Sequence, residues 1–329
     1  MKPQNPRRSF VLTAAALGSA LVLPGCGGGS DNNNAFPILP ITPPPEQPKN
    51  IVQLAAATPQ LSLLAEAVTA AGLVDTLSAT GPFTVFAPTN DAFSALLAEL
   101  GLSKDALFAD KALLTAVLTY HVLGRRVLKA DIPLGRAIVP VGGGFFKIEA
   151  VADAVRITDG RNRVTTILST DTAASNGVVH IVDRVLLPAN RDIVQTAQAT
   201  PTLSILVEAV VAAGLVATLK GTGPFTVFAP TDDAFAALLT ELNVTKAALL
   251  ADTALLTKVL TYHVVPGRVL KAEIPLDTPI TTVQGSSIRI SAALQITDAR
   301  SRVSGIAATD IFNTNGVVHV INRVLLPPA

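Results

Sequence analysis

Four histidines are the side chains best suited to acid–base chemistry or metal binding, and each lies in a stretch that occurs twice: His121, His180, His263 and His319. A pair in each half of the chain could act as an acid–base couple or hold a metal ion. A zinc site needs three or four converging ligands, but no His-x-His, Glu-x-x-His or cysteine cluster lies near any of the four. We therefore predict hydrogen-bonded structural histidines and no metal or other cofactor.

Few other residues suit catalysis. The only cysteine, Cys26, lies outside the repeated stretches, and no serine stands in a Gly-x-Ser-x-Gly turn. The glycines at 142–144 lack the following helix and the lysine of a phosphate-binding loop. A hydrolase that relied on the repeated histidines and carboxylates would lack a recognisable nucleophile. The sequence therefore predicts a protein that is not an enzyme.

The two tyrosines, Tyr120 and Tyr262, each stand directly before a histidine. They are either exposed recognition residues or half-buried rings whose hydroxyls find a partner at the edge of the core. Thr-Asn-Asp at 89–91 and Thr-Asp-Asp at 231–233 suggest a cation site or the start of a helix. We favour the helix start, because a hydroxyl caps the first turn and carboxylates meet the positive end of the helix dipole without any ligand.

These residues belong to two copies of one domain. GPFTVFAPTNDAF (81–93) and GPFTVFAPTDDAF (223–235) differ at a single position, Asn90 against Asp232. Similarity this close over a fixed interval indicates an internal repeat. Within the block, alternating residues predict a strand that the second proline ends, and the next threonine is placed to cap a helix.

The rest of each copy predicts helices first and strands later. Thr58-Pro59 and Thr200-Pro201 place a hydroxyl to cap a helix whose first residue is proline. Short β-branched segments punctuated by glycine follow the LTYHV block, which predicts antiparallel strands. An Asn-Gly pair, expected to supply the positive φ of a tight turn, then precedes a long apolar strand. This order predicts an α+β fold with a small sheet or sandwich in each copy, domain one at 50–188 and domain two at 193–328.

Charge and composition exclude one large class of partner. The formal net charge is +1, from 25 basic and 24 acidic residues, whereas a nucleic-acid-binding surface needs a clustered basic excess. Aromatic residues make up 4% of the chain and tryptophan is absent, so platforms for stacking bases are scarce. We therefore expect no nucleic-acid partner.

Residues 1–26 resemble a bacterial export signal. RRSFV at positions 7–11 is similar to a twin-arginine motif, and the apolar run that follows is too short to span a bilayer. LPGC, ending at Cys26, resembles a lipobox in which the cysteine takes a diacylglycerol, although Pro24 departs from the small residue usual there. The alternative is an ordinary cleaved signal with an incidental cysteine.

Residues 27–49 are rich in Gly, Asn and Pro and predict a disordered tether that holds the folded domains away from a membrane, or a leader without a role. We expect an exported lipoprotein of the cell envelope. The outer membrane is favoured because Gly27, and not an aspartate, follows Cys26. Otherwise the protein would be periplasmic or secreted.

Three blocks occur in the same order in both repeats: FTVFAPT-x-DAF, then LTYHV, then NGVVH with a further apolar run. Together they resemble the fasciclin-like domain over nearly all of residues 50–328. The resemblance implies that each copy is a compact β-sandwich or wedge flanked by helices, with a role in adhesion or extracellular binding and no shared enzymatic activity. The whole chain resembles a tandem fasciclin-like pair in an exported bacterial lipoprotein.

The resemblance also implies binding residues. In animal members, the Tyr-His block and an Asp-Ile pair before the Asn-Gly-Val block contribute to adhesion. The matching residues of this chain are Tyr120, His121, Tyr262, His263, Asp310 and Ile311. Repeat one carries Asp171-Thr172 where repeat two has the Asp-Ile pair, so the pattern is incomplete there.

We therefore expect a non-catalytic adhesion or binding module, anchored to the cell surface or envelope. Its expected partners are extracellular matrix, polysaccharide or a surface protein. The alternative is a periplasmic carrier or sensor that holds a small apolar ligand in an interdomain or groove site. That alternative rests on the apolar composition and on the short connection at 189–192, which couples the two domains closely.

Overall fold

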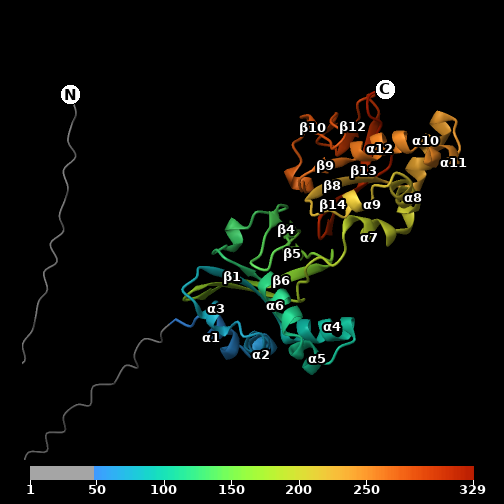
Figure 1. Cartoon of the computed structure of the whole chain (residues 1–329). Coiled ribbons are helices and arrows are strands. Elements are labelled where there is room, and N and C mark those ends of the chain that lie inside the picture. The colour runs from blue at the N-terminus through green and yellow to red at the C-terminus, as the bar shows by residue number, and fades with distance from the viewer. Residues whose placement is uncertain (1–47) are drawn as a thin grey trace, which may run out of the picture. The chain divides into compact units, whose positions relative to one another are not determined.

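The structure is a computed structural model that describes residues 48–329. These residues belong to one compact unit that extends from Gln47 to Ala329 and contains both repeats (Figure 1). The predicted export signal, Cys26 and all but the end of the predicted tether lie outside the described residues. Within residues 48–329 no single helix is long and apolar enough to cross a membrane. The pair Ile51–Ala57 and Pro59–Ala70 meets that requirement only when taken together, across a bend of 112°.

Domain one begins with helices, places one strand between two groups of helices, and ends with strands. Its helices are α1 (Ile51–Ala57), α2 (Ser62–Ala70), α3 (Val74–Ser78), α4 (Asn90–Leu100), α5 (Lys104–Ala109) and α6 (Lys111–Tyr120). Its strands are β1 (Phe83–Pro88), β2 (Val122–Leu123), β3 (Ala137–Ile138), β4 (Phe146–Val151), β5 (Ala154–Thr158), β6 (Val164–Ala174) and β7 (Gly177–Val182). Short 3-10 helices are η1 (Pro59–Leu61) and η2 (Lys129–Asp131).

Domain two repeats this order of elements. Its helices are α7 (Ile193–Gln198), α8 (Ser204–Ala212), α9 (Val216–Leu219), α10 (Asp232–Leu242), α11 (Lys246–Ala251) and α12 (Thr253–Tyr262). Its strands are β8 (Phe225–Pro230), β9 (Val264–Pro266), β10 (Ile280–Thr281), β11 (Ser287–Ile290), β12 (Gln295–Thr297), β13 (Val303–Asn313) and β14 (Gly316–Ile321). Short 3-10 helices are η3 (Pro201–Leu203) and η4 (Lys271–Glu273).

The strands of each domain form one curled sheet. The order is β2-β1-β7-β6-β5-β4-β3 in domain one, and domain two has the equivalent order. Register shifts interrupt the pairing of β6 with β7 and of β13 with β14, and such bulges bend a strand and let the sheet curl. The predicted α+β fold is confirmed. The parallel pairing of β1 with β7 was not predicted, because it joins segments from opposite ends of the domain sequence.

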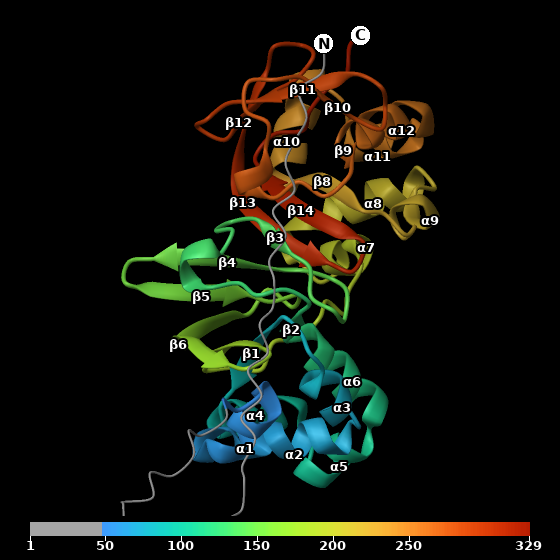
Figure 2. The ribbon, with the colours of Figure 1, turned by 90° about the vertical axis from the view of Figure 1, so that its left-hand side faces the viewer.

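Strand β1 lies between two cores, which explains why it is apolar on both faces. Val85 and Ala87 pack with the helices, whereas Phe86 packs with the residues of the curled sheet. Figure 2 shows the helices α1–α6 on one side of β1 and the strands β3–β6 on the other. Strand β8 repeats this arrangement in domain two. The stretch that is most alike in the two repeats is therefore the one that must fit two cores.

The predicted helix starts after β1 and β8 are confirmed. The hydroxyls of Thr89 and Thr231 accept hydrogen bonds from the first turns of α4 and α10. At the one position that differs between the two blocks, the side chain forms a hydrogen bond with the start of a neighbouring helix. The Oδ1 atoms of Asn90 and Asp232 accept backbone N–H groups at the starts of α2 and α8, at 3.0 and 2.8 Å. Because both side chains offer an acceptor at the same place, the exchange preserves this contact.

The predicted caps at Thr58 and Thr200 are wrong. Neither hydroxyl caps the 3-10 helix that follows it. Each donates instead to a carbonyl of the preceding turn, that of Leu54 or Thr196, at 2.8 Å. The helices α1 and α7 end beside these threonines, and a hydroxyl at the end of a helix readily bonds back to the carbonyl four residues earlier.

The predicted role of the Asn-Gly pair is also corrected in domain one. Gly177 is the first residue of β7, after the turn, and a Cβ atom there would lie 2.1 Å from the carbonyl oxygen of Phe83. Glycine is thus needed for the close approach of β1 and not for a turn of positive φ. The Asn176 side chain bonds the start of α1 and the carbonyls of Leu77 and Ala79, so it ties the helices to the sheet.

Candidate functional site

The two tyrosines expected to contact a partner are fully buried. Tyr120 and Tyr262 are 0% exposed and stand at the ends of α6 and α12. Their hydroxyls donate to the carbonyls of Phe145 at 2.5 Å and Ser287 at 2.8 Å. Burial raises the pKa of both hydroxyls, so they remain protonated donors at neutral pH. Direct contact of these rings with a partner stays a prediction, and it would require each domain to open.

The neighbouring histidines use both ring nitrogens within the domain. Nδ1 of His121 lies 2.7 Å from the carbonyl oxygen of Val117, and Nε2 accepts the N–H of Leu186 at 2.9 Å. His263 makes the equivalent two contacts in domain two. Because one nitrogen accepts and the other faces a carbonyl, each ring is neutral with its hydrogen on Nδ1. Burial lowers the pKa of both histidines to about 4, against the opposing effect of the carbonyl hydrogen bond.

The second pair of histidines supports the bulged strands. Nδ1 of His180 accepts the N–H of Asp171, and Nδ1 of His319 accepts that of Asp310, both at 3.2 Å. Their Nε2 atoms face backbone carbonyls at 3.0 Å, and burial lowers the pKa of both rings. The carboxylates of Asp171 and Asp310 in turn accept the first N–H of η2 and of η4 at 2.8 Å. Asp310 of the predicted Asp-Ile pair and Asp171 of repeat one therefore share these contacts within their own domains.

A buried ion pair beside the Tyr-His block was not predicted. Asp159 is 0% exposed, and its Oδ2 accepts from Nη2 of Arg163 at 2.7 Å and from the N–H of Leu187 at 3.0 Å. Asp298 and Arg302 form the equivalent pair in domain two. The sequence signal is the pattern Asp-x-Arg-x-Arg, which follows β5 and β12 at matching places. It was missed because a charged pattern in a loop usually indicates a solvated surface.

These polar residues form hydrogen bonds that connect the last segment of each domain to the middle of the domain sequence. We call the set the Tyr-His lock; its members are Tyr120, His121, Asp159 and Arg163 in domain one, and Tyr262, His263, Asp298 and Arg302 in domain two. In domain one, His121 and Asp159 hold consecutive N–H groups of the segment after β7. Within residues 48–329 no three His, Cys, Asp or Glu side chains come together as a metal site would require. The hydrogen bonds of the lock connect the LTYHV block and the loop after β5 to the segment after β7.

Asp310 lies where domain two meets domain one. Its Oδ2 is 2.8 Å from Nζ of Lys147, which is also 3.0 Å from Oε1 of Glu149. The side chains of Lys147 and Asp310 are only 9% and 2% exposed. Burial by itself lowers the pKa of Lys147, but the hydrogen bonds and charges of Asp310 and Glu149 together outweigh it and hold the pKa above its usual value. Ile311, beside it, is partly buried against the helical core of domain two.

Apolar and backbone contacts complete this junction. The rings of Phe145 and Phe312 lie 4.7 Å apart between centroids, and the guanidinium of Arg268 lies 4.3 Å from the centroid of Phe145. The side-chain amide of Asn162 accepts the N–H of Phe312 at 2.6 Å and donates to its carbonyl at 3.1 Å. Asn162 thereby satisfies both backbone groups of an interface residue. The two domains are therefore joined by specific contacts and present their surfaces together.

Replacing Lys147 by alanine is expected to reduce the free energy that holds the two domains together by about 2 kcal/mol. Asp310 stays buried without its cation, but it still accepts the hydrogen bond from the N–H of Lys271. Calorimetry should then resolve two unfolding transitions where the parent chain shows one, and proteolysis should cut faster within residues 189–192. Lys111→Ala, at an exposed lysine on α6, is the matched control. Equal behaviour of the two variants would show that the ion pair does not couple the domains.

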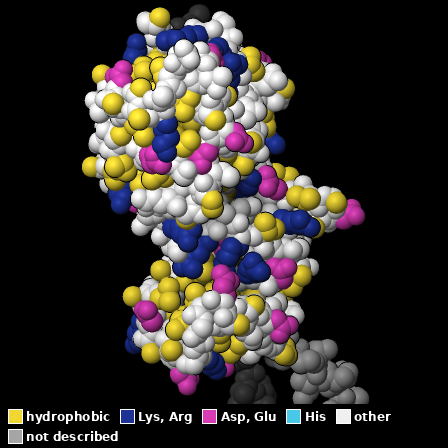
Figure 3. Space-filling model, turned by 90° about the vertical axis from the view of Figure 1, so that its right-hand side faces the viewer, with side chains coloured by type: hydrophobic (Ala, Val, Ile, Leu, Met, Phe, Trp, Pro, Cys, Tyr) yellow, Lys and Arg dark blue, Asp and Glu magenta, His cyan; other side chains and the backbone are white. Residues whose placement is uncertain are grey.

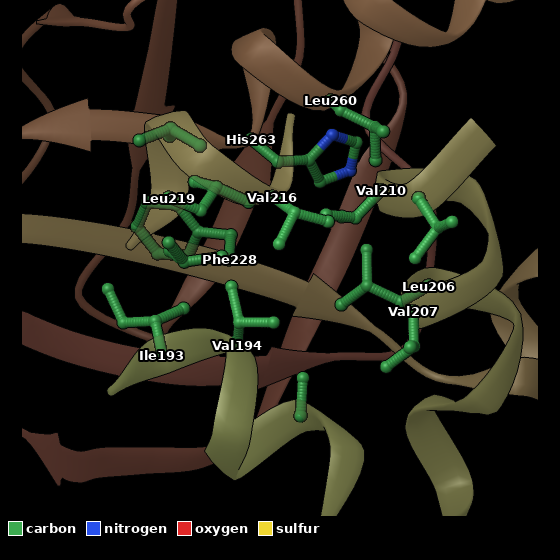
Figure 4. A pocket seen from close by; sticks show the side chains of 14 residues that line it. Ile193, Val194, Leu206, Val207, Val210, Val216, Leu219, Phe228, Leu260 and His263 are labelled. Carbon is green, nitrogen blue, oxygen red and sulfur yellow. The ribbon is translucent and has the colours of Figure 1, made fainter. Parts of the chain in front are cut away.

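Domain two also contains a small apolar pocket between α7, α8, α9 and β8 (Figure 4). The side chains that line it are non-polar except for His263, whose ring borders the cavity. The free volume is about 30 Å³, and the equivalent pocket of domain one has about 20 Å³. Such volumes hold one or two water molecules at most. Neither pocket admits a larger apolar ligand unless side chains move.

Two α+β domains, each closed around an internal polar lock and each built from the same blocks, define a tandem of repeated modules. The fasciclin domain family model matches residues 59–188 and 201–327. These two matches cover most of the chain, so the chain belongs to the fasciclin-domain family.

Similar proteins come from animals and bacteria. The chain is 29% identical over 253 residues to transforming growth factor-beta-induced protein ig-h3 of Sus scrofa, covering 75% of this chain and 35% of that protein. It is 27% identical over 301 residues to periostin of Homo sapiens, covering 90% of this chain and 33% of that protein. The chain therefore spans about a third of the length of these two relatives. Protein sll1483 of Synechocystis sp. is 43% identical over 141 residues, covering 42% of this chain and 73% of that protein.

Among solved structures, the chain is similar to a FAS1 domain pair from the insect cell adhesion molecule fasciclin I. The identity is 18% and the TM-score is 0.39, over 81% of this chain and 97% of that one.

Proposed function

We propose that the chain is a non-catalytic adhesion or binding protein of the cell envelope. It is exported, anchored by a lipid on Cys26, and presents two joined fasciclin domains to extracellular matrix, polysaccharide or a surface protein. The observation that carries the proposal is the match of both repeats to a family of adhesion and binding modules. The engagement of the repeated histidines, tyrosines and aspartates inside the domains supports a structural and not a catalytic use of these side chains.

The joined domains suit such a role physically. Two binding surfaces held at a fixed separation raise the effective concentration of the second surface once the first has bound. The ion pair of Lys147 with Asp310 and the contact between the tilted rings of Phe145 and Phe312 hold that separation. Partners would therefore contact the outer surfaces of the two domains, while the Tyr-His lock stabilises the fold of each domain from inside.

Protease shaving of intact cells that express the full chain tests the location. We expect the domains to be released from wild-type cells, because an anchored surface protein is accessible from outside. Cys26→Ala is the control for anchoring, and its product should appear in the medium or periplasm without a membrane fraction. Protection of the wild-type domains until the envelope is opened would contradict surface presentation.

Binding of the purified full chain to matrix polymers, polysaccharides and cell surfaces tests the activity. We expect saturable binding that survives Tyr120→Phe combined with Tyr262→Phe, because phenylalanine keeps the buried ring and removes only the internal hydroxyl contact. Loss of binding in this variant while it remains folded would instead make the tyrosines contact residues. No saturable binding to any of these surfaces would contradict the adhesion role.

The carrier or sensor alternative needs a cavity that suits an apolar ligand. The two equivalent apolar pockets beside His121 and His263 have free volumes of only about 20 and 30 Å³. A further pocket of domain two has about 230 Å³ and is lined by apolar side chains and Arg300. Two cavities of about 430 and 440 Å³ lie at the domain junction. Arginines and asparagines line the first, and Glu149, Lys271 and Asp310 stand among the alanines and leucines of the second, so charged groups oppose an apolar ligand in both.

A further inference from the structure

A cavity of about 430 Å³ lies where domain one, the linker and domain two come together. The loop at 160–163, the linker residues Asn190 and Arg191, and Ile311 with Phe312 of β13 contribute to its lining. This volume is typical of pockets that bind small molecules. Asn190 and Arg191 are exposed, so the cavity reaches the surface.

Arg161 in this cavity lacks the partner that its counterpart has. Its Nε is shielded from solvent and has no hydrogen-bond partner among residues 48–329. In domain two, the equivalent Arg300 donates from Nε to the carbonyl of Pro327 at 2.9 Å. In domain one the chain continues from Pro188 into the linker, and Arg161 makes no such bond. A buried donor without an acceptor is costly, so the position is suited to an acceptor supplied by a ligand.

The cavity also carries positive charge that the protein does not neutralise. Arg163 is paired with Asp159 and with Glu99, a carboxylate that also lines the cavity. Arg161 and Arg191, by contrast, form no ion pair with any residue of the described part. Burial lowers the pKa of Arg161, and the nearby charge of Arg163 lowers it further. On the face shown in Figure 3, lysine and arginine side chains gather about half-way along the molecule.

Other polar side chains of the cavity already form hydrogen bonds within the protein. The hydroxyl of Thr196 donates to the side chain of Asn313, and that of Thr200 donates to the carbonyl of Thr196. Asn162 is bonded to the backbone of Phe312. The free donors are therefore the guanidinium groups of Arg161 and Arg191, with the amide of Asn190 beside them.

We infer that this cavity binds a small organic acid of about monosaccharide size through a carboxylate, phosphate or sulfate group held by Arg161 and Arg191. A guanidinium presents two parallel donors that match two oxygens of such a group. The same chemistry comes either from a free acid or from an acidic sugar within a polysaccharide. The inference deepens the proposed binding role, and the adhesion role can stand without it.

Isothermal titration of the purified full chain at low ionic strength tests this site. The probes are inorganic phosphate, glucuronate and trigalacturonate, each titrated into the parent chain, Arg161→Gln, Arg191→Gln and the control Arg126→Gln. Arg126 is exposed and lies outside the cavity. We expect one molecule bound per chain, with affinity reduced about ten-fold or more in the two cavity variants and nearly unchanged in the control, since each removes a charge-assisted pair.

The outcomes separate the two sources of the acid. Equal affinity for glucuronate and trigalacturonate indicates a free small acid, and tighter binding of trigalacturonate indicates a polysaccharide. The exposed Arg191 keeps the test valid if Arg161→Gln fails to fold. No binding of any probe, or equal binding by the cavity variants and the control, overturns the inference. Adhesion of those same variants to cell surfaces would then show that the broader binding role still holds.

Discussion

Replacing Asp159 by alanine should destabilise domain one by about 3–5 kcal/mol, because it leaves Arg163, whose side chain is only 13% exposed, without its main counter-charge. The carboxylate is completely buried and also accepts the N–H of Leu187, so the segment after β7 loses an anchor as well. Denaturant unfolding followed by circular dichroism measures the loss. Since a whole domain has only about 5–15 kcal/mol of net stability, domain one of this variant should unfold well before domain two.

Two further substitutions make this experiment decisive. Asp298→Ala removes the equivalent carboxylate and should shift the loss to domain two. Asp153→Ala removes an exposed carboxylate in the turn between β4 and β5 and should change stability by no more than about 0.5 kcal/mol. If Asp159→Ala unfolds at the same denaturant concentration as Asp153→Ala, the ion pair does not hold the domain together.

Acid should destabilise both domains between pH 6.5 and pH 4, through their buried histidines. His121 and His263 have pKa values of about 4 in the folded state, against 6.5 for an ordinary histidine. In this interval the unfolded chain binds more protons than the folded chain, so the free energy of unfolding falls as the pH falls. Each of the two histidines then contributes a loss of about 3 kcal/mol by pH 4, and above pH 6.5 it contributes none.

Unfolding midpoints measured in denaturant from pH 7.5 to pH 4.5 test this dependence. His121→Gln and His263→Gln should be less stable at pH 7.5, because the N–H of Leu186 or Leu325 loses its acceptor. Their stability should also fall less steeply with acid, because one titrating group is gone from each. A pH dependence of the parent chain that these variants leave unchanged would assign the acid sensitivity to other groups.

The sequence was sufficient to predict the parts of the fold that depend on local patterns. Alternating residues, a proline and a capping threonine define β1 and α4, and these signals act within a dozen residues. Comparison of the two repeats also identified the positions that matter, since Tyr120, His121 and His180 all proved to be buried. The predicted structural role of the histidines agrees with the hydrogen bonds that both nitrogens make.

The contacts between distant segments could not be predicted in this way. Lys147 and Asp310 are 163 residues apart and carry no periodic signal that would pair them. The parallel pairing of β1 with β7 depends on the whole domain sequence, as does the place of Asp159 under the last segment. The resemblance indicated which residues recur in the family, but burial decides whether they face a partner or the core.

The central claim is that the repeated Tyr-His block holds each domain together from inside. Nitrogen-detected NMR of the four imidazoles across pH 4 to 8 tests it most directly. We expect neutral rings at pH 7, with the hydrogen on Nδ1 for His121 and His263 and on Nε2 for His180 and His319, and no protonation of the first two above about pH 5. A ring of the block that titrates near pH 6.5, or that exchanges between tautomers, would show a histidine open to solvent or a partner and would contradict the claim.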